Sequence, residues 1–147
     1  PENSHVMASL IRKFSEAKKY SKRKVICWGS GKPLREFLHV DDLSDSCLFL
    51  LENWDPLSSN APKDKNGNNL YYLNVGTGKE ISIKELAYKI ANLVDFKGEI
   101  IWDNTKPDGT FRKRLDISKI NSLGWHPKIE LEEGLQKTIK HFCKENF

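Results

Sequence analysis

The chain has 147 residues, a net charge of +4 and 38% hydrophobic residues, which fits one domain with a modest core. No apolar run approaches the roughly 20 residues that a membrane helix needs, and the N-terminus lacks a signal-peptide pattern. Cys27, Cys47 and Cys143 are odd in number and widely spaced, which disfavours a disulfide framework or a zinc site. We therefore expect a cytoplasmic protein with neither a membrane partner nor a metal.

Basic residues cluster at 12–24 and 106–114. Clusters of this kind suit either nucleic acid or a phosphorylated metabolite. The aromatic residues do not interleave with the basic ones in the way that base-stacking proteins require. A phosphorylated small molecule is therefore the expected partner, and nucleic acid is not.

The first predicted helix runs from about His5 to Lys18, with Ser4 as its candidate N-cap. His5 lies in the first turn, where an imidazole is either a surface side chain or a group that faces a ligand. Lys13 lies two turns later and, by residue type alone, reads as a solvated lysine. The apolar residues of this helix recur at helical spacing: Met7, Leu10, Ile11, Phe14 and Ala17.

The stretch WGSGKPLREFLHVDD, residues 28–42, holds the strongest functional signal. It follows a predicted strand at 24–28, and Gly29 and Gly31 mark a turn where the backbone must bend or approach a neighbour closely. Arg35 beside this turn suits a phosphate, because a planar guanidinium donates to two oxygens at once. The alternative reading is a hairpin with a surface arginine. Trp28 is either core or a flat platform for a ligand.

After Arg35, the apolar residues of 37–40 predict further strand, and Asp41 and Asp42 are candidate N-caps of the next helix. That helix, predicted to end near Asn53, is apolar over more than one face, so we expect it to be covered on several sides. A polar loop at 54–69 follows. The run Leu70–Val75 is rich in β-forming residues and predicts a buried parallel strand.

The remainder alternates helices and short strands. Ser82 and Glu85 form a capping box before a helix that ends near Val94, and Glu99–Trp102 predicts a strand. Asp116 is the candidate cap of a short helix at 117–123, which Gly124 closes, and a last helix spans about 131–146. This pattern predicts an α/β fold with about five helices.

The polar loop 103–113, DNTKPDGTFRK, is the second candidate site. Such loops are usually only solvated. In a turn with Pro107 and Gly109, however, Asp108 can direct a carboxylate at ligand hydroxyls, and Lys106 and Arg112 can meet an anion.

Residues 28–42 resemble the matching segment of the extended short-chain dehydrogenase/reductase family, among the NAD-dependent epimerase/dehydratases. Further similar stretches follow in the same order as in that family: PENSHV at the start, NVGTG at 74–78, KPDGT at 106–110, and LD-S-LGW over 115–125. The resemblance implies the C-terminal substrate-binding part of such an enzyme, one that binds a GDP-sugar. The family's Gly-rich dinucleotide fingerprint is absent, because the G-S-G and G-T-G turns do not complete G-x-G-x-x-G. The resemblance implies that the fingerprint and the family's Tyr-x-x-x-Lys pair lie upstream of these residues.

The resemblance also implies residue roles. His5 corresponds to the acid that serves the proton steps and lies near the nicotinamide. Lys13, which stands where the family usually has Arg, and Arg35 correspond to substrate contacts, with Arg35 on the diphosphate. Trp28 and Asp108 correspond to residues that position the nucleotide-sugar. Lys106 and Arg112 are weaker candidates. Phe111 replaces the usual Pro of this loop.

The implied parent reaction is epimerisation of a GDP-4-keto-6-deoxyhexose at C3 and C5, followed by NADPH reduction at C4. We expect residues 1–147 to be the nucleotide-sugar-binding region, and the helix and strand within 40–80 to return to a Rossmann sheet that this chain lacks. NADP would be bound mainly by that missing half, the full-length parent would be a homodimer, and the chain alone would be inactive. The alternatives are an epimerase or dehydratase for another sugar nucleotide, or a non-catalytic nucleotide-binding module.

Overall fold

The computed structural model describes residues 5–147 and divides into two compact units. Unit 1 contains Pro1–Arg35, Ile81–Lys113 and Glu132–Phe147, and unit 2 contains Glu36–Glu80 and Arg114–Leu131. Ser4, the expected N-cap of the first helix, lies outside the described residues.

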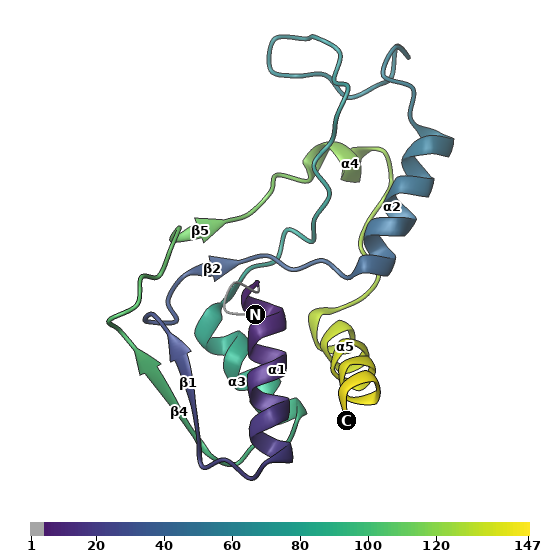
Figure 1. Ribbon diagram of the computed structural model, residues 1–147. Coiled ribbons are helices and arrows are strands. Elements are labelled where there is room, and N and C mark those ends of the chain that lie inside the picture. The colour runs from purple at the N-terminus through teal and green to yellow at the C-terminus, as the bar shows by residue number, and fades with distance from the viewer. Residues whose placement is uncertain (1–4) are drawn as a thin grey trace. The chain divides into compact units, whose positions relative to one another are not determined.

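Two small sheets belong to unit 1 (Figure 1). In one, β1 (Lys24–Trp28) runs parallel to β4 (Glu99–Asp103). In the other, β2 (Leu34–Arg35) lies between β3 (Ile81–Ser82) and β5 (Arg112–Lys113). The predicted strands at 24–28 and 99–102 are confirmed.

The predicted strand character of residues 37–40 is wrong. Strand pairing ends with β2 at Arg35, and helix α2 already begins at Val40. These apolar residues follow a two-residue strand and do not extend it, so the alternation of residue types did not reveal where strand pairing ends.

Three helices complete unit 1: α1 (Val6–Lys19), α3 (Ile83–Leu93) and α5 (Leu131–Asn146). Helix α1 packs against α3 and β1, and the rings of Phe14 and Phe96 lie 5.6 Å apart between centroids. The predicted apolar stripe of α1 is buried from Leu10 to Ala17, so the amphipathic pattern placed this helix correctly. The other buried apolar residues of this unit's helices are Leu86, Ala87, Ile90, Ala91, Leu135 and Ile139.

The predicted capping box at the start of α3 is confirmed. The Ser82 side chain accepts from the Glu85 backbone N–H at 3.1 Å, and the Glu85 carboxylate accepts from the Ser82 backbone N–H at 3.0 Å. The Ser82 hydroxyl also donates to this carboxylate at 2.7 Å and, with the backbone N–H, lowers the pKa of Glu85. The two residues thereby satisfy backbone donors that the helix itself leaves unpaired.

Asp95 follows the C-cap of α3 with a left-handed backbone, φ +56°, and its carboxylate contacts Lys18 at 2.8 Å and Lys97 at 2.6 Å. Hydrogen bonds from these two lysines lower the pKa of Asp95 from 3.8 to about 2. Because the folded-state pKa is depressed, ionised Asp95 stabilises the fold above about pH 4, and this contribution disappears as the pH falls to about 2. We expect carboxyl NMR titration to give a pKa near 2 for Asp95, and a titration near 3.8 would contradict the lysine contacts.

In unit 2, helix α2 (Val40–Asn53) begins differently from the sequence prediction. His39 is the N-cap, and its side chain accepts from the Asp41 backbone N–H at 3.2 Å. Asp42, expected as a cap, is instead only 2% exposed and accepts from the backbone N–H groups of Lys128 (3.1 Å) and Ile129 (2.9 Å). The sequence did not indicate this contact, because Lys128 and Ile129 lie more than 80 residues after Asp42 in the chain.

Asp45, one turn after Asp42, also joins α2 to the segment that contains Lys128. Its carboxylate accepts from the Trp125 indole N–H at 2.8 Å and from the Lys128 ammonium at 3.0 Å. These bonds, with Lys128 first, lower the pKa of Asp45. Helix α4 (Ser118–Ser122) precedes this segment, and Gly124 adopts φ +100° after it, as the sequence predicted.

Residues 70–75, predicted to form a parallel strand of a sheet that this chain lacks, form no ladder with any described residue. A β-forming run becomes a strand only when another strand supplies its backbone partners. Tyr71 and Tyr72 are 69% and 77% exposed, and Leu48 and Leu51 of α2 are 62% and 83% exposed. Unit 2 thus carries the uncovered apolar surface expected of a chain without additional strands.

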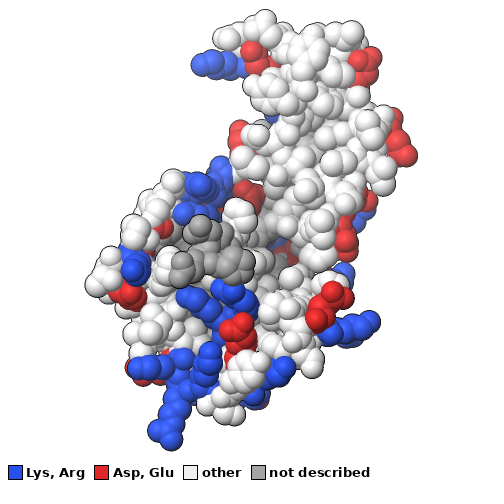
Figure 2. Space-filling model, viewed as in Figure 1, with Lys and Arg blue, Asp and Glu red and all other residues white. Residues whose placement is uncertain are grey.

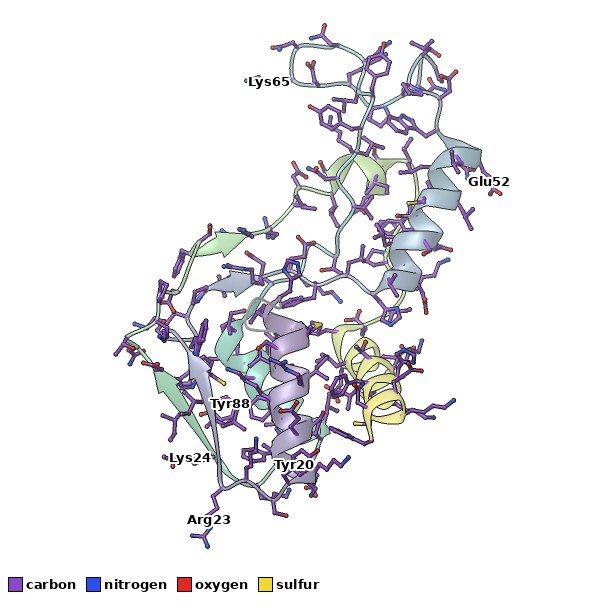
Figure 3. The ribbon with its side chains drawn as sticks, in the orientation of Figure 1. Tyr20, Arg23, Lys24, Glu52, Lys65 and Tyr88 are labelled. Carbon is purple, nitrogen blue, oxygen red and sulfur yellow. The ribbon has the colours of Figure 1, made fainter. Side chains whose placement is uncertain are left out.

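Lys65 lies at the tip of the loop after α2 (Figure 3).

Within residues 5–147, no helix has the length and apolar character needed to cross a bilayer. The three cysteines are free, and Cys27 is buried in unit 1.

Candidate functional site

A cavity of about 360 Å³ lies within unit 1. Five elements (α1, β1, β2, α3 and β4) and two turns form its walls, and four of the predicted site residues are among the lining residues: Lys13, Trp28, Arg35 and Asp108. The other lining residues are Val6, Ser9, Leu10, Arg12, Cys27, Gly31, Pro33, Ile83, Trp102 and Pro107. The predicted residues come from sequence positions nearly 100 residues apart, so their convergence on one cavity is a property of the fold.

Arg35 leaves most of its guanidinium donors available. The side chain is half-buried, and its Nη1 donates to the backbone carbonyl of Leu34 at 2.7 Å. Its Nη2 lies near Gly109, 3.9 Å from where a Cβ would stand. No carboxylate pairs with Arg35 among the described residues. A half-buried guanidinium without an acidic partner is well suited to a bound anion.

Trp28 is 57% exposed at the end of β1 and lies between two lysines. The Lys13 ammonium is 5.6 Å from the ring centroid, and the Lys106 ammonium is 5.5 Å from it. Lys13 also donates to the backbone carbonyl of Ile26 at 2.9 Å, which fixes the position of its charge. Positive charge therefore flanks a flat aromatic surface, an arrangement that suits a ring carrying phosphate groups.

Asp108 lines the cavity, but both of its carboxylate oxygens are bound by Ser30. Oδ1 accepts from the Ser30 backbone N–H at 2.6 Å, and Oδ2 accepts from the Ser30 hydroxyl at 2.7 Å. The hydroxyl bond, followed by the backbone bond, lowers the pKa of Asp108. Asp108 is therefore ionised at neutral pH and joined to the glycine turn.

The remaining predicted residues are placed differently. His5 is exposed at the N-cap position of α1, makes no capping bond with its side chain, and is not among the lining residues. Lys106 approaches the cavity only through Trp28. Arg112 is exposed in β5, where it is paired with Leu34 of β2, and does not line the cavity.

Arg12, Trp102 and Ser9 are among the wall residues that sequence reasoning did not assign to the site. Trp102 lies opposite Cys27 in the register of β1 and β4, so it enters the cavity wall through strand pairing. Val6, Ser9, Leu10 and Lys13 recur at helical spacing, and this periodicity was the available signal for the face of α1 that lines the cavity. Cys27 is a buried wall residue whose thiol pKa is raised by burial, so it is a poor nucleophile.

The charged lining is mostly basic: Arg12, Lys13 and Arg35 against Asp108. Figure 2 shows Lys and Arg side chains gathered over unit 1 on the face in view. Because three basic side chains face one ionised carboxylate, the charged lining has a net positive charge, which attracts anions. No group of three or more potential metal ligands occurs in the described part of the chain.

The glycine turns do not provide a dinucleotide site. A Cβ on Gly29 would overlap the Asp108 carboxylate, and one on Gly31 would overlap the Trp102 ring. In unit 2, a Cβ on Gly76 would overlap the carboxylate of Glu36, which accepts from the Thr77 and Gly78 backbone N–H groups. These turns make room for the protein's own side chains, whereas a dinucleotide fingerprint leaves that space for a pyrophosphate. These glycine turns therefore do not form a dinucleotide site, and no step through NADP follows from them.

Comparison with known proteins first gives the class. Residues 1–62 match the model of the NAD dependent epimerase/dehydratase family. A solved structure described as a GDP-6-OMe-4-keto-L-xylo-heptose reductase from C. jejuni superimposes with a TM-score of 0.80 at 36% identity, over 97% of this chain and 49% of that one. The mixed α/β fold class is thus confirmed.

Comparison with individual named proteins then gives more specific similarities. Over 98% of its length the chain is 49% identical to the putative GDP-L-fucose synthase 2 of Arabidopsis thaliana, and it covers 40% of that protein. It is 43% identical to the GDP-L-fucose synthase of Escherichia coli K12, of which it covers 44%. The resemblance inferred from the sequence motifs is confirmed. The chain spans less than half the length of these relatives.

Proposed function

We propose that this chain is the nucleotide-sugar-binding part of a cytoplasmic, NADP-dependent enzyme that converts GDP-4-keto-6-deoxy-D-mannose to GDP-L-fucose. The observation that carries the proposal is the half-buried Arg35 guanidinium, without a carboxylate partner among the described residues, in a cavity with Lys13, Trp28 and Asp108. Relatives at 43–49% identity are named for the same product.

Each residue takes a role that its chemistry permits. Arg35 donates to the diphosphate through its planar fork, and Lys13 adds a fixed positive charge beside it. Trp28 presents a flat surface to a sugar or base, and Asp108 accepts from ligand hydroxyls with its remaining lone pairs. His5 serves the proton steps at C3 and C5, since an imidazole both donates and accepts protons near neutral pH.

NADP is proposed to be bound by residues beyond this chain, because the glycine turns of the chain are filled by its own side chains. We further propose that the apolar surface of α2 and residues 70–75 packs against the Rossmann sheet of the longer protein, and that this protein is a homodimer. The exposure of Leu48, Leu51, Tyr71 and Tyr72 supports the first of these contacts, because covering these apolar side chains would be favourable.

Calorimetry with nucleotides tests the binding role directly. GDP is expected to bind the chain at least about tenfold more tightly than GMP, because the second phosphate adds charge-assisted hydrogen bonds to Arg35. UDP is the control for base selectivity. Tighter binding of UDP than GDP would favour an enzyme for another sugar nucleotide, and equal binding of GDP and GMP would remove the diphosphate role of the cavity.

Activity of the isolated chain provides a separate check. We expect no NADPH oxidation by the purified 147 residues in the presence of the keto-sugar nucleotide, because the described turns have no room for a dinucleotide. Absorbance at the NADPH band measures this, with buffer lacking protein as the control. Turnover above that background would overturn the assignment of NADP binding to residues outside the chain.

A further inference from the structure

The loop between β4 and β5 is held to the rest of unit 1 at three places. At its ends, the Gly29 backbone N–H donates to the Asp103 carbonyl at 2.9 Å, and the Leu34 backbone N–H donates to the Phe111 carbonyl at 2.8 Å. Between these ends, residues 104–111 are exposed, and the contact of Asp108 with Ser30 holds the middle of the loop.

The Ser30–Asp108 contact is built into the turn in more than one way. Ser30 supplies two donors to the two carboxylate oxygens, at 2.6 and 2.7 Å. The Ser30 hydroxyl oxygen also accepts from the Lys32 backbone N–H at 3.2 Å, which orients it within the turn. Gly29, at φ +77°, leaves the space that the carboxylate occupies, since any Cβ there would overlap it. Turn and carboxylate are therefore complementary in both shape and charge.

We propose that Ser30 is a positioning residue of the nucleotide-sugar site, which acts through Asp108 to hold the 103–111 loop against the cavity. The inference rests on the proposed function of that cavity. The contact fixes Pro107 and Asp108 as wall residues and keeps Gly109 beside the Arg35 guanidinium. Ser30 itself does not line the cavity, so its effect on a ligand passes through the loop.

A double-mutant cycle on GDP binding tests this role. Ser30→Ala removes the hydroxyl donor and keeps the backbone donor, so we expect GDP affinity to fall about three- to tenfold. Ser30→Thr retains a hydroxyl and should restore most of the affinity. In an Asp108→Ala background, Ser30→Ala should cause no further loss, because the partner through which it acts is gone.

Thr105→Ala is the matched control. Thr105 makes the same kind of contact in the same loop, since its hydroxyl donates to Asp103 at 2.6 Å and its backbone N–H donates at 3.0 Å. Neither Thr105 nor Asp103 lines the cavity, so this variant should bind GDP as the parent does.

The outcomes separate this inference from the proposed function. If the parent chain does not bind GDP, the proposed function fails and this inference fails with it. If the parent binds GDP but Ser30→Ala binds equally well, or its loss is undiminished in the Asp108→Ala background, only the positioning role is overturned. A loss in Ser30→Ala that Ser30→Thr does not recover would likewise count against the hydroxyl contact.

Discussion

Arg35→Ala is expected to weaken GDP binding by roughly 1.5–3 kcal/mol, which is about a 10- to 150-fold rise in Kd. The substitution removes a half-buried guanidinium that donates to the backbone carbonyl of Leu34. Within residues 5–147 no carboxylate pairs with Arg35, so the loss should appear in binding rather than in folding. Isothermal titration calorimetry with GDP gives the measurement.

Arg35→Lys and Arg23→Ala are the companion variants. Lysine keeps the charge but lacks the planar fork, so Arg35→Lys should fall between the parent and Arg35→Ala. Arg23 points away from the sheet at the start of β1 (Figure 3), and its substitution makes the same change in net charge away from the cavity. If Arg23→Ala weakened GDP binding as much as Arg35→Ala, the effect would be one of overall charge.

Asp42→Ala is expected to destabilise unit 2 by about 2–4 kcal/mol. The carboxylate is 2% exposed and accepts from the backbone N–H groups of Lys128 and Ile129, which would lose their acceptor. Urea unfolding followed by circular dichroism measures the loss in free energy of unfolding. Amide hydrogen exchange at Lys128 and Ile129 locates it, and both amides should exchange faster in the variant.

Asp41→Ala is the control for this prediction, because Asp41 precedes Asp42 on the same helix and its side chain is 69% exposed. Asp41→Ala should lower the free energy of unfolding by no more than about 0.5–1 kcal/mol, the usual contribution of an acidic residue near a helix N-terminus. Equal destabilisation by the two variants would mean that helix electrostatics, and not the buried contact, accounts for the role of Asp42.

The helices were largely predictable because their signals are local. The stripe of α1, the Ser82–Glu85 capping box and the left-handed Gly124 each depend on residues within a few positions of one another. Strands were harder, because a strand needs a partner that the local sequence does not specify. Residues 24–28 pair with β4, whereas residues 70–75 pair with no strand in the described chain.

The candidate site residues show the same difference between local signals and long-range contacts. Arg35, Trp28, Lys13 and Asp108 were predicted from residue chemistry and family resemblance, and all four line one cavity. Arg112 does not, because its β5 register places it outside the wall. Trp102 and Ser30 were missed, because their importance arises from pairing with a second strand and with a residue 78 positions away.

By itself, the amino-acid sequence determined where the helices form, which candidate site side chains are basic, and that the glycine turns do not complete a dinucleotide fingerprint. Only the tertiary structure decided that Asp42 is a buried acceptor rather than a cap, and that Asp108 is joined to Ser30. The physical reason is range. Helix periodicity and capping act within one or two turns, whereas burial, strand register and carboxylate partners depend on segments that only folding brings together.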